Sequence, residues 1–135
     1  MTKLAVKQMK ILTLAYMGDV VFEKYIREYL ILSGKVKPQI LHEKAVSFVS
    51  AKGQAYILKG WLGEEKLTEE ELAIVRRGRN VKVNVPRNLD FMTYRYSTAF
   101  EALIGYLYFS KSMDRLNMLI EDGIKRIEER GSKDA

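Results

Sequence analysis

Two acidic residues are isolated from the other charges of the chain by apolar surroundings. Asp19 is the only charged residue of the segment ILTLAYMGDVVF, and Glu101 is the only one of YSTAFEALIGYLYFS. An ionised carboxylate on an apolar helix face costs free energy unless a cation meets it. The sequence therefore indicates a cationic partner for each of these acids.

The chemistry of that partner has two interpretations. Two helices packed together would bring both carboxylates to one point, and oxygen ligands from one or two carboxylates plus water are how proteins commonly hold magnesium beside phosphates. Alternatively, each acid makes a buried salt bridge, for example with Arg95 or a nearby lysine. Spacing alone leaves both interpretations open.

Basic residues are concentrated in one part of the chain. The net charge is +6, and the segment from position 76 to 95 holds six basic residues against one acid, so it carries +5, while the remaining 17 basic and 16 acidic residues nearly cancel. The six are Arg76, Arg77, Arg79, Lys82, Arg87 and Arg95. Arginine forks fit phosphate oxygens, and amides such as that of Asn80 add hydrogen bonds. The segment indicates a polyanionic partner such as nucleic acid, the alternative being an exposed loop with incidental charge.

Composition excludes several kinds of site. There is no cysteine and only one histidine, His42, which rules out disulfides, thiolate nucleophiles and a Cys/His zinc site. No run approaches the ~20 apolar residues that a membrane-spanning helix needs, so we expect a cytoplasmic protein without a membrane partner. A length of 135 residues corresponds to one ordinary domain, which we expect to cover positions 1–135.

Helical periodicity runs through the whole chain, so an all-α domain is expected. Apolar residues keep helical spacing from Ile11 to Leu32, and a second stripe runs from Leu41 to near Trp61, with Pro38 just ahead of it. Further helices are predicted from a capping box at Thr68 to about position 77, from 96 to 110 and from 113 to 129. Positions 78–88 are predicted to be a loop, because a glycine at 78 stops the helix, and 131–135 a frayed tail.

The order of these motifs resembles the ribonuclease III family. LAYMGD, residues 14–19, is similar to the first signature of that family, a hydrophobic helix carrying a Gly-Asp pair, and FEALIGYLY, residues 100–108, resembles the second, whose glutamate coincides with Glu101. LHEKAVSFVSAKGQA and RRGRN fall between them at the family's distances, so the resemblance covers essentially the whole chain. Without an appended double-stranded-RNA-binding domain, the chain is most similar to the compact branch, Mini-ribonuclease III.

The resemblance implies a single ribonuclease III-like catalytic helical domain that hydrolyses double-stranded RNA. Asp19 and Glu101 would be the catalytic residues and hold Mg²⁺, which activates a bound water. The family acts as a homodimer and leaves 5′-phosphate and 3′-hydroxyl ends. The RNA-binding residues would be those of the basic segment: Arg76, Arg77, Arg79, Asn80, Lys82 and Arg87. For the compact branch, the implied substrate is the duplex stem of the 23S ribosomal RNA precursor, and a ribosomal protein is a further candidate partner.

One difference from the pattern of the larger family members leaves a second hypothesis open. The larger enzymes place further acids where this chain has Ala15 and Thr98, so only two of four metal-site carboxylates are present and the number of metal ions is open. The compact branch shares this reduced set. Glu23, one turn after Asp19, is a weaker candidate for an indirect contact. The alternative function is a non-catalytic module that binds structured RNA on the same fold.

Overall fold

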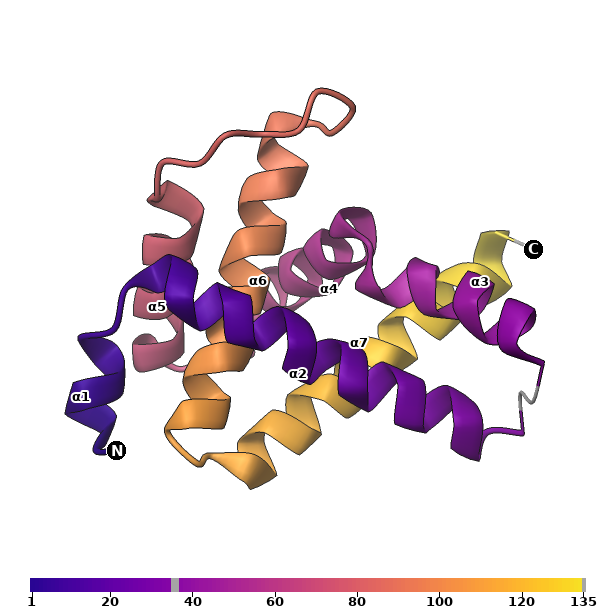
Figure 1. Ribbon diagram of the computed structural model, residues 1–135, viewed down its shortest axis with the longest axis horizontal. Coiled ribbons are helices and arrows are strands. Elements are labelled where there is room, and N and C mark those ends of the chain that lie inside the picture. Colours follow the sequence, from indigo (N-terminus) through magenta and orange to yellow (C-terminus); the bar gives the residue numbers. More distant parts are fainter. Residues whose placement is uncertain (35–36, 135) are drawn as a thin grey trace.

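The computed structural model describes the backbone of residues 1–34 and 37–134, and these residues form seven helices and no strand (Figure 1). The helices are α1 Lys3–Lys7, α2 Ile11–Leu32, α3 Pro38–Val49, α4 Ala51–Gly63, α5 Glu69–Asn80, α6 Phe91–Phe109 and α7 Met113–Asp134. The predicted all-α class is confirmed. None of the helices in the described part of the chain is long and apolar enough to cross a membrane.

Helix α6 is the centre of the fold. It packs against α2, α4 and α5, and α2 makes the most extensive of these contacts. Helix α7 begins beside the C-terminal end of α6 and runs away from it at an angle (Figure 1). The aromatic core lies at the same place: the Phe100 ring of α6 meets the Phe22 ring of α2 edge-on at 4.8 Å and stacks on the Trp61 ring of α4 at 5.6 Å, between ring centres. Burial of these three side chains holds α2, α4 and α6 together.

The second predicted stripe is two helices rather than one. Ser50 ends α3 and begins α4, because its extended backbone breaks the helix and its hydroxyl accepts a hydrogen bond from the Gly53 amide at 3.1 Å. Pro38 is the first residue of α3, where its missing N–H costs nothing. The short helix α1 was not predicted. At the other end, α7 passes the predicted end at position 129 and reaches Asp134, so it includes most of the stretch expected to fray; residue 135 lies outside the described residues.

The predicted helix stop at Gly78 is wrong. Helix α5 continues to Asn80, and a Cβ atom at position 78 would lie 2.7 Å from the Cα atom of Ala99 on α6. The glycine therefore permits close packing of α5 on α6 instead of ending the helix. The capping box that starts α5 is confirmed, with Thr68 and Glu71 each accepting a hydrogen bond from the other's backbone amide.

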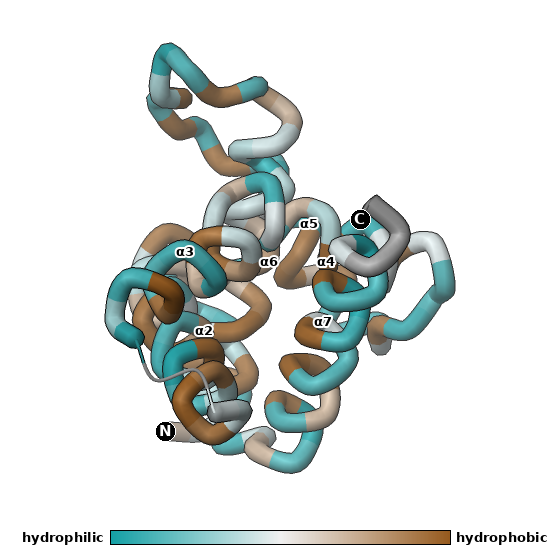
Figure 2. Tube along the Cα trace, turned by 90° about the vertical axis from the view of Figure 1, so that its right-hand side faces the viewer, coloured by the Kyte–Doolittle hydropathy of each residue, from teal (hydrophilic) through white to brown (hydrophobic). Residues whose placement is uncertain are grey.

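The connection between α5 and α6 stands away from the helical body. Residues 81–90 project from it in both views (Figures 1 and 2). Asp90 closes this loop by accepting a hydrogen bond from the Thr93 amide at 3.0 Å, so α6 begins at Phe91, five residues before its predicted start.

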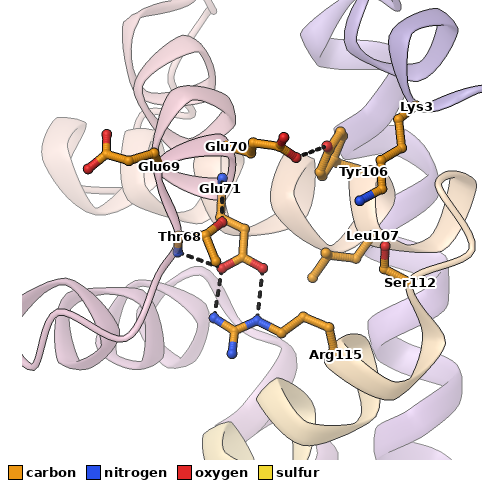
Figure 3. A pocket seen from close by; sticks show the side chains of 9 residues that line it. All are labelled: Lys3, Thr68, Glu69, Glu70, Glu71, Tyr106, Leu107, Ser112 and Arg115. Atoms are coloured by element: carbon orange, nitrogen blue, oxygen red, sulfur yellow. Dashed lines mark hydrogen bonds and ion pairs between the residues drawn. The ribbon is translucent and has the colours of Figure 1, made fainter.

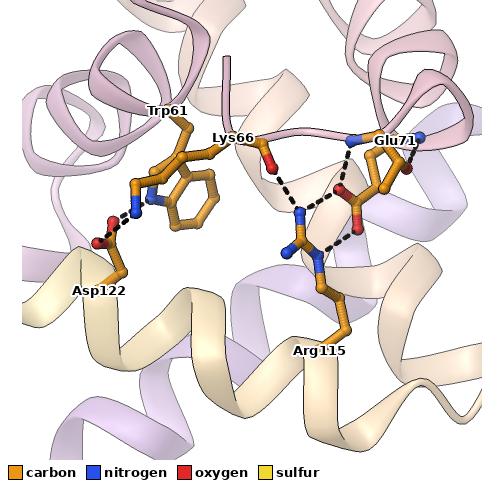
Figure 4. A network of polar contacts seen from close by, with 6 residues as sticks. Trp61, Lys66, Glu71, Arg115 and Asp122 are labelled. Atoms are coloured by element: carbon orange, nitrogen blue, oxygen red, sulfur yellow. Dashed lines mark hydrogen bonds and ion pairs between the residues drawn. The ribbon is translucent and has the colours of Figure 1, made fainter. Parts of the chain in front are cut away.

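A buried ion pair joins the start of α5 to α7. The Glu71 carboxylate, 3% exposed, accepts two hydrogen bonds from the Arg115 guanidinium at 2.9 and 2.7 Å, and Arg115 also donates to the Lys66 carbonyl at 2.7 Å (Figure 4). Burial opposes ionisation of Glu71, but the hydrogen bonds from Arg115 and Thr68 outweigh it and hold the pKa of Glu71 below its usual range. Beside this pair, Asp122 of α7 accepts a hydrogen bond from the Trp61 indole at 2.7 Å (Figure 4).

Candidate active site

Two glycines bring α2 and α6 into backbone contact. A Cβ atom at Gly18 would lie 1.7 Å from the carbonyl oxygen of Glu101, and one at Gly105 would lie 2.0 Å from the carbonyl oxygen of Leu14. No side chain fits at either position without separating the helices. Because Gly18 precedes Asp19, this crossing brings Asp19 beside Glu101, and the structure thus joins the two carboxylates that the sequence singled out.

The Asp19 and Glu101 side chains lie within hydrogen-bonding reach of each other. Asp19 is exposed on α2, whereas Glu101 is half-buried on α6. Burial, the hydrogen bond with Asp19 and the repulsion of the Asp19 charge together raise the pKa of Glu101 to about 8, and a hydrogen bond from Gln54 opposes that rise. Two carboxylates in contact cannot both ionise cheaply, so the pair favours a proton or a cation between them.

The alternative of one salt bridge for each acid finds no support. Within residues 1–34 and 37–131, neither Asp19 nor Glu101 forms a salt bridge. Arg95, the proposed partner, instead donates to the carbonyl of Arg79 at 2.6 Å and lies over the Phe91 ring, 5.0 Å from its centre.

Three neighbouring positions add no acidic ligand to the pair. Ala15 is buried on α2, and the buried Thr98 hydroxyl donates to the Tyr94 carbonyl of its own helix at 3.1 Å. Glu23 forms an ion pair with Arg27 at 2.7 Å. The described residues contain no cluster of three or more Asp, Glu, His or Cys side chains that could hold a metal ion.

The donor chemistry of the pair fits magnesium all the same. Two carboxylates supply hard oxygen ligands, and Mg²⁺ is commonly held by one or two carboxylates while keeping several waters and contacting substrate phosphates. Asp19 is exposed, so water and a phosphate have access to this residue.

The predicted RNA-binding residues divide between a helix and a loop. Arg76, Arg77, Arg79 and Asn80 lie on the last turns of α5, and only Lys82 and Arg87 lie in the projecting loop. Arg77 is engaged structurally, because its guanidinium donates to the backbone carbonyls of residues 7 and 9 at 2.8 and 2.9 Å. Arg76 reaches Glu69 only at 4.0 Å across exposed surface.

The basic residues lie near the start of α6, and Glu101 lies at its middle. The Arg95–Arg79 hydrogen bond ties the beginning of α6 to the end of α5. Glu101 follows Arg95 by six residues on α6, which at about 1.5 Å per residue is roughly 9 Å along the axis. The end of α5 and the carboxylate pair are thus joined through the first half of α6.

Sequence reasoning missed two polar residues of this site. Gln54 on α4 is 1% exposed, and its Oε1 atom accepts a hydrogen bond from the Ser97 hydroxyl of α6 at 2.7 Å. The signal for Gln54 was an amide within the apolar stripe of the second predicted helix; Ser97 gave no distinct signal.

A pocket at the C-terminal end of α6 is lined by residues that stabilise the fold. The residues that line it are Lys3, Thr68, Glu69, Glu70, Glu71, Tyr106, Leu107, Ser112 and Arg115 (Figure 3). Several of its polar groups bind one another: Arg115 donates to Glu71, and the Tyr106 hydroxyl donates to Glu70 at 3.3 Å. The carboxylate pair of α2 and α6 is therefore the better candidate for chemistry.

Known proteins are similar to this chain in sequence and in fold. Residues 12–112 match the Ribonuclease III domain family. Among curated proteins, a Mini-ribonuclease 3 from Enterococcus faecalis is 45% identical, over 94% of this chain and 97% of its own length, and one from Staphylococcus aureus is 44% identical, over 93% and 94%. A crystal structure of a protein from Fusobacterium nucleatum matches with a TM-score of 0.79 at 32% identity, over 87% of this chain and 95% of that one.

The chain therefore belongs to the ribonuclease III family, whose members are endoribonucleases that act on double-stranded RNA. Within that family it groups with the Mini-ribonuclease 3 proteins, as the sequence motifs predicted.

Proposed function

We propose that this protein is a magnesium-dependent endoribonuclease that cuts double-stranded RNA at the Asp19–Glu101 pair. The observation that carries the proposal is the direct contact of two carboxylates from separate helices, neither of which has a salt-bridge partner within residues 1–34 and 37–131. A divalent cation would replace their shared proton and relieve their repulsion.

The two carboxylates differ in their exposure. Glu101 is half-buried and contacted from within the fold, and Asp19 is exposed, so Glu101 and Asp19 together would hold the ion at the surface, where RNA has access. When bound, magnesium supplies polarisation of the phosphate and a water of lowered pKa. Hydrolysis in which water adds to phosphorus, the bond from phosphorus to the 3′ oxygen breaks and the 3′ oxygen takes up a proton would leave a 5′ phosphate and a 3′ hydroxyl.

The same experiment tests the metal and the products. A duplex RNA is incubated with the protein in magnesium or in EDTA, with the product ends identified by phosphatase sensitivity. Cleavage in magnesium with 5′-phosphate ends supports the proposal, and Asp19→Asn and Glu101→Gln should reduce cleavage by orders of magnitude while RNA binding survives. Mutants that cut at the wild-type rate would remove these residues from the active site.

We further propose that the basic end of α5 and the adjoining loop bind the RNA backbone. Duplex RNA is read mainly through its shape, phosphates and 2′-hydroxyls. Arg76, Arg79, Lys82 and Arg87 carry this binding, together with the amide of Asn80, whereas Arg77 acts through the fold. Replacing Arg76, Arg79 and Lys82 by glutamine should weaken binding to many duplexes alike and flatten its salt dependence. Unchanged binding across a salt titration would exclude this surface.

A two-fold homodimer is the proposed active form. Exposed apolar side chains follow one face of α2 beside Asp19: Leu12, Tyr16 and Val20 are 45%, 80% and 55% exposed. A two-fold axis uses the same patch on both subunits, and two sites related in this way suit the two antiparallel strands of a duplex. Sedimentation at micromolar concentration should give twice 15.6 kDa, and Tyr16→Glu should shift it toward the monomer. A monomer that cuts both strands at matched positions would refute the dimer.

The proposed substrate is the duplex stem of the 23S ribosomal RNA precursor in the cytoplasm, with a ribosomal protein as a candidate helper. The test compares cleavage of that stem with cleavage of a duplex of equal length and unrelated sequence, with and without ribosomal proteins. The replacement of two family carboxylates by Ala15 and Thr98 favours one competing function, a module that binds structured RNA without cutting it. A wild-type protein that binds these duplexes but never cuts them would establish that competitor.

A further inference from the structure

A buried amide connects α4 to the carboxylate pair. Gln54 is 1% exposed and is hydrogen-bonded to Ser97, which lies one helical turn before Glu101 on the same side of α6. Its amide is thereby placed beside Glu101, and a hydrogen bond from Gln54 opposes the rise in the pKa of Glu101. Placing an amide in an apolar interior costs free energy unless its polar atoms are paired, so a glutamine here has to be compensated by specific partners.

The partners of Gln54 determine which way its amide faces. Its oxygen accepts the hydrogen bond from the Ser97 hydroxyl at 2.7 Å. Its nitrogen, which can only donate, is therefore the atom that meets the Glu101 carboxylate, which can accept. In this arrangement Gln54 acts on the Glu101 carboxylate as a hydrogen-bond donor.

The start of α4 sets the position of Gln54. The Ser50 hydroxyl caps the helix through the Gly53 amide, and a Cβ atom at Gly53 would lie 2.4 Å from the Ser47 carbonyl oxygen and 2.6 Å from that of Phe48. The last turn of α3 thus lies against the first turn of α4. This close junction holds the residue after Gly53 in one place, where it faces α6.

We propose that Gln54 and Ser97 are positioning residues that hold the Glu101 carboxylate in the orientation that binds the metal ion. The inference rests on the proposed function, because it assumes that Glu101 is a metal ligand. A carboxylate on a flexible glutamate stem loses side-chain entropy when it binds a metal, and a fixed donor imposes part of that loss in advance. Residues of this kind typically contribute about 10- to 100-fold to metal affinity or activity.

The test uses Gln54→Leu and Ser97→Ala in the full chain, with Ser110→Ala as the control. Ser110 is a partly buried serine at the C-terminal end of α6, away from the carboxylate pair. Its hydroxyl donates a hydrogen bond to the Leu107 carbonyl. One readout is the MgCl₂ concentration that gives half-maximal cleavage. The other is the increase in melting temperature that MgCl₂ or MnCl₂ produces over EDTA without RNA, which reports metal binding by linkage.

We expect Gln54→Leu to raise the half-maximal magnesium concentration by about tenfold and to reduce the metal-dependent increase in melting temperature. Ser97→Ala should have a smaller effect in the same direction, since the amide can then rotate. The double variant should be no worse than Gln54→Leu, because Ser97 acts only through Gln54. Ser110→Ala should match the wild type in both readouts.

Two results would overturn the inference. A lower melting temperature in EDTA with an unchanged magnesium requirement would make Gln54 and Ser97 merely structural, and fully additive effects would separate them from each other. If Gln54→Leu does not fold, Ser97→Ala decides alone. Glu101→Gln distinguishes this failure from failure of the proposed function. If Glu101→Gln cleaves at the wild-type rate, Glu101 is not a metal ligand and the proposed function fails. If Glu101→Gln loses cleavage while Gln54→Leu keeps the wild-type magnesium requirement, only the positioning role is refuted.

Discussion

Replacing Glu101 with glutamine should stabilise the metal-free protein at alkaline pH. In the fold, burial and contact with Asp19 raise the pKa of Glu101 from 4.5 to about 8. Between these pH values the folded protein holds a proton that the unfolded chain has lost. The free energy of unfolding therefore falls as the pH rises through this window. Glutamine keeps the size of the side chain and does not titrate, so the variant lacks this loss.

The size of the effect follows from the two pKa values. They differ by about 3.5, and each pH unit corresponds to about 1.4 kcal/mol, so the effect is at most ~5 kcal/mol at pH 8. At pH 4 the wild type and Glu101→Gln should be nearly equal in stability. Asp19→Asn should narrow the pH range over which the stability falls, because the repulsion from Asp19 is gone. It should not abolish that range, because the burial of Glu101 remains.

The assay is urea unfolding of wild type and Glu101→Gln in EDTA at several pH values from 4 to 9. The difference in unfolding free energy between the two proteins cancels the titration of their other groups. That difference should favour Glu101→Gln increasingly above pH 5, and magnesium at pH 8 should stabilise only the wild type. The reasoning is refuted if Glu101→Gln is less stable than the wild type at pH 8, the result expected if Glu101 made a buried salt bridge.

Three further changes test the packing around the site. Gly18→Ala should lower the free energy of unfolding in urea by ~1–3 kcal/mol or more and abolish cleavage, because its Cβ atom would overlap the Glu101 carbonyl of α6. The control Gly63→Ala, where the new Cβ atom would have no neighbour within 4 Å, should change neither. Arg77→Ala should lower the melting temperature by removing two hydrogen bonds to the N-terminal segment, and Arg76→Ala should leave it unchanged; equal values would contradict the structural role of Arg77. Glu71→Gln should destabilise by about 3–5 kcal/mol in urea unfolding, since it leaves the Arg115 charge without its ion pair; a loss below 1 kcal/mol would refute this.

Sequence patterns were sufficient to predict those features that depend on interactions between residues close together in the chain. The 3.6-residue spacing of apolar side chains predicts α2 with its observed ends, and the capping box at Thr68 predicts the start of α5, because hydrogen bonds within a few residues decide both. Isolation in apolar segments likewise identified Asp19 and Glu101 as residues that need a partner.

The tertiary structure determined which residues from distant parts of the chain come into contact. A glycine ends a helix or admits a neighbouring helix, and only the position of Ala99 shows that Gly78 does the second. Spacing along the chain did not distinguish a salt bridge from a carboxylate pair, since the partner of Glu101 lies 82 positions earlier and reaches it through the close crossing of α2 and α6. The contact between Gln54 and Ser97 depends on how α4 packs on α6, and no periodicity within either helix encodes that distance.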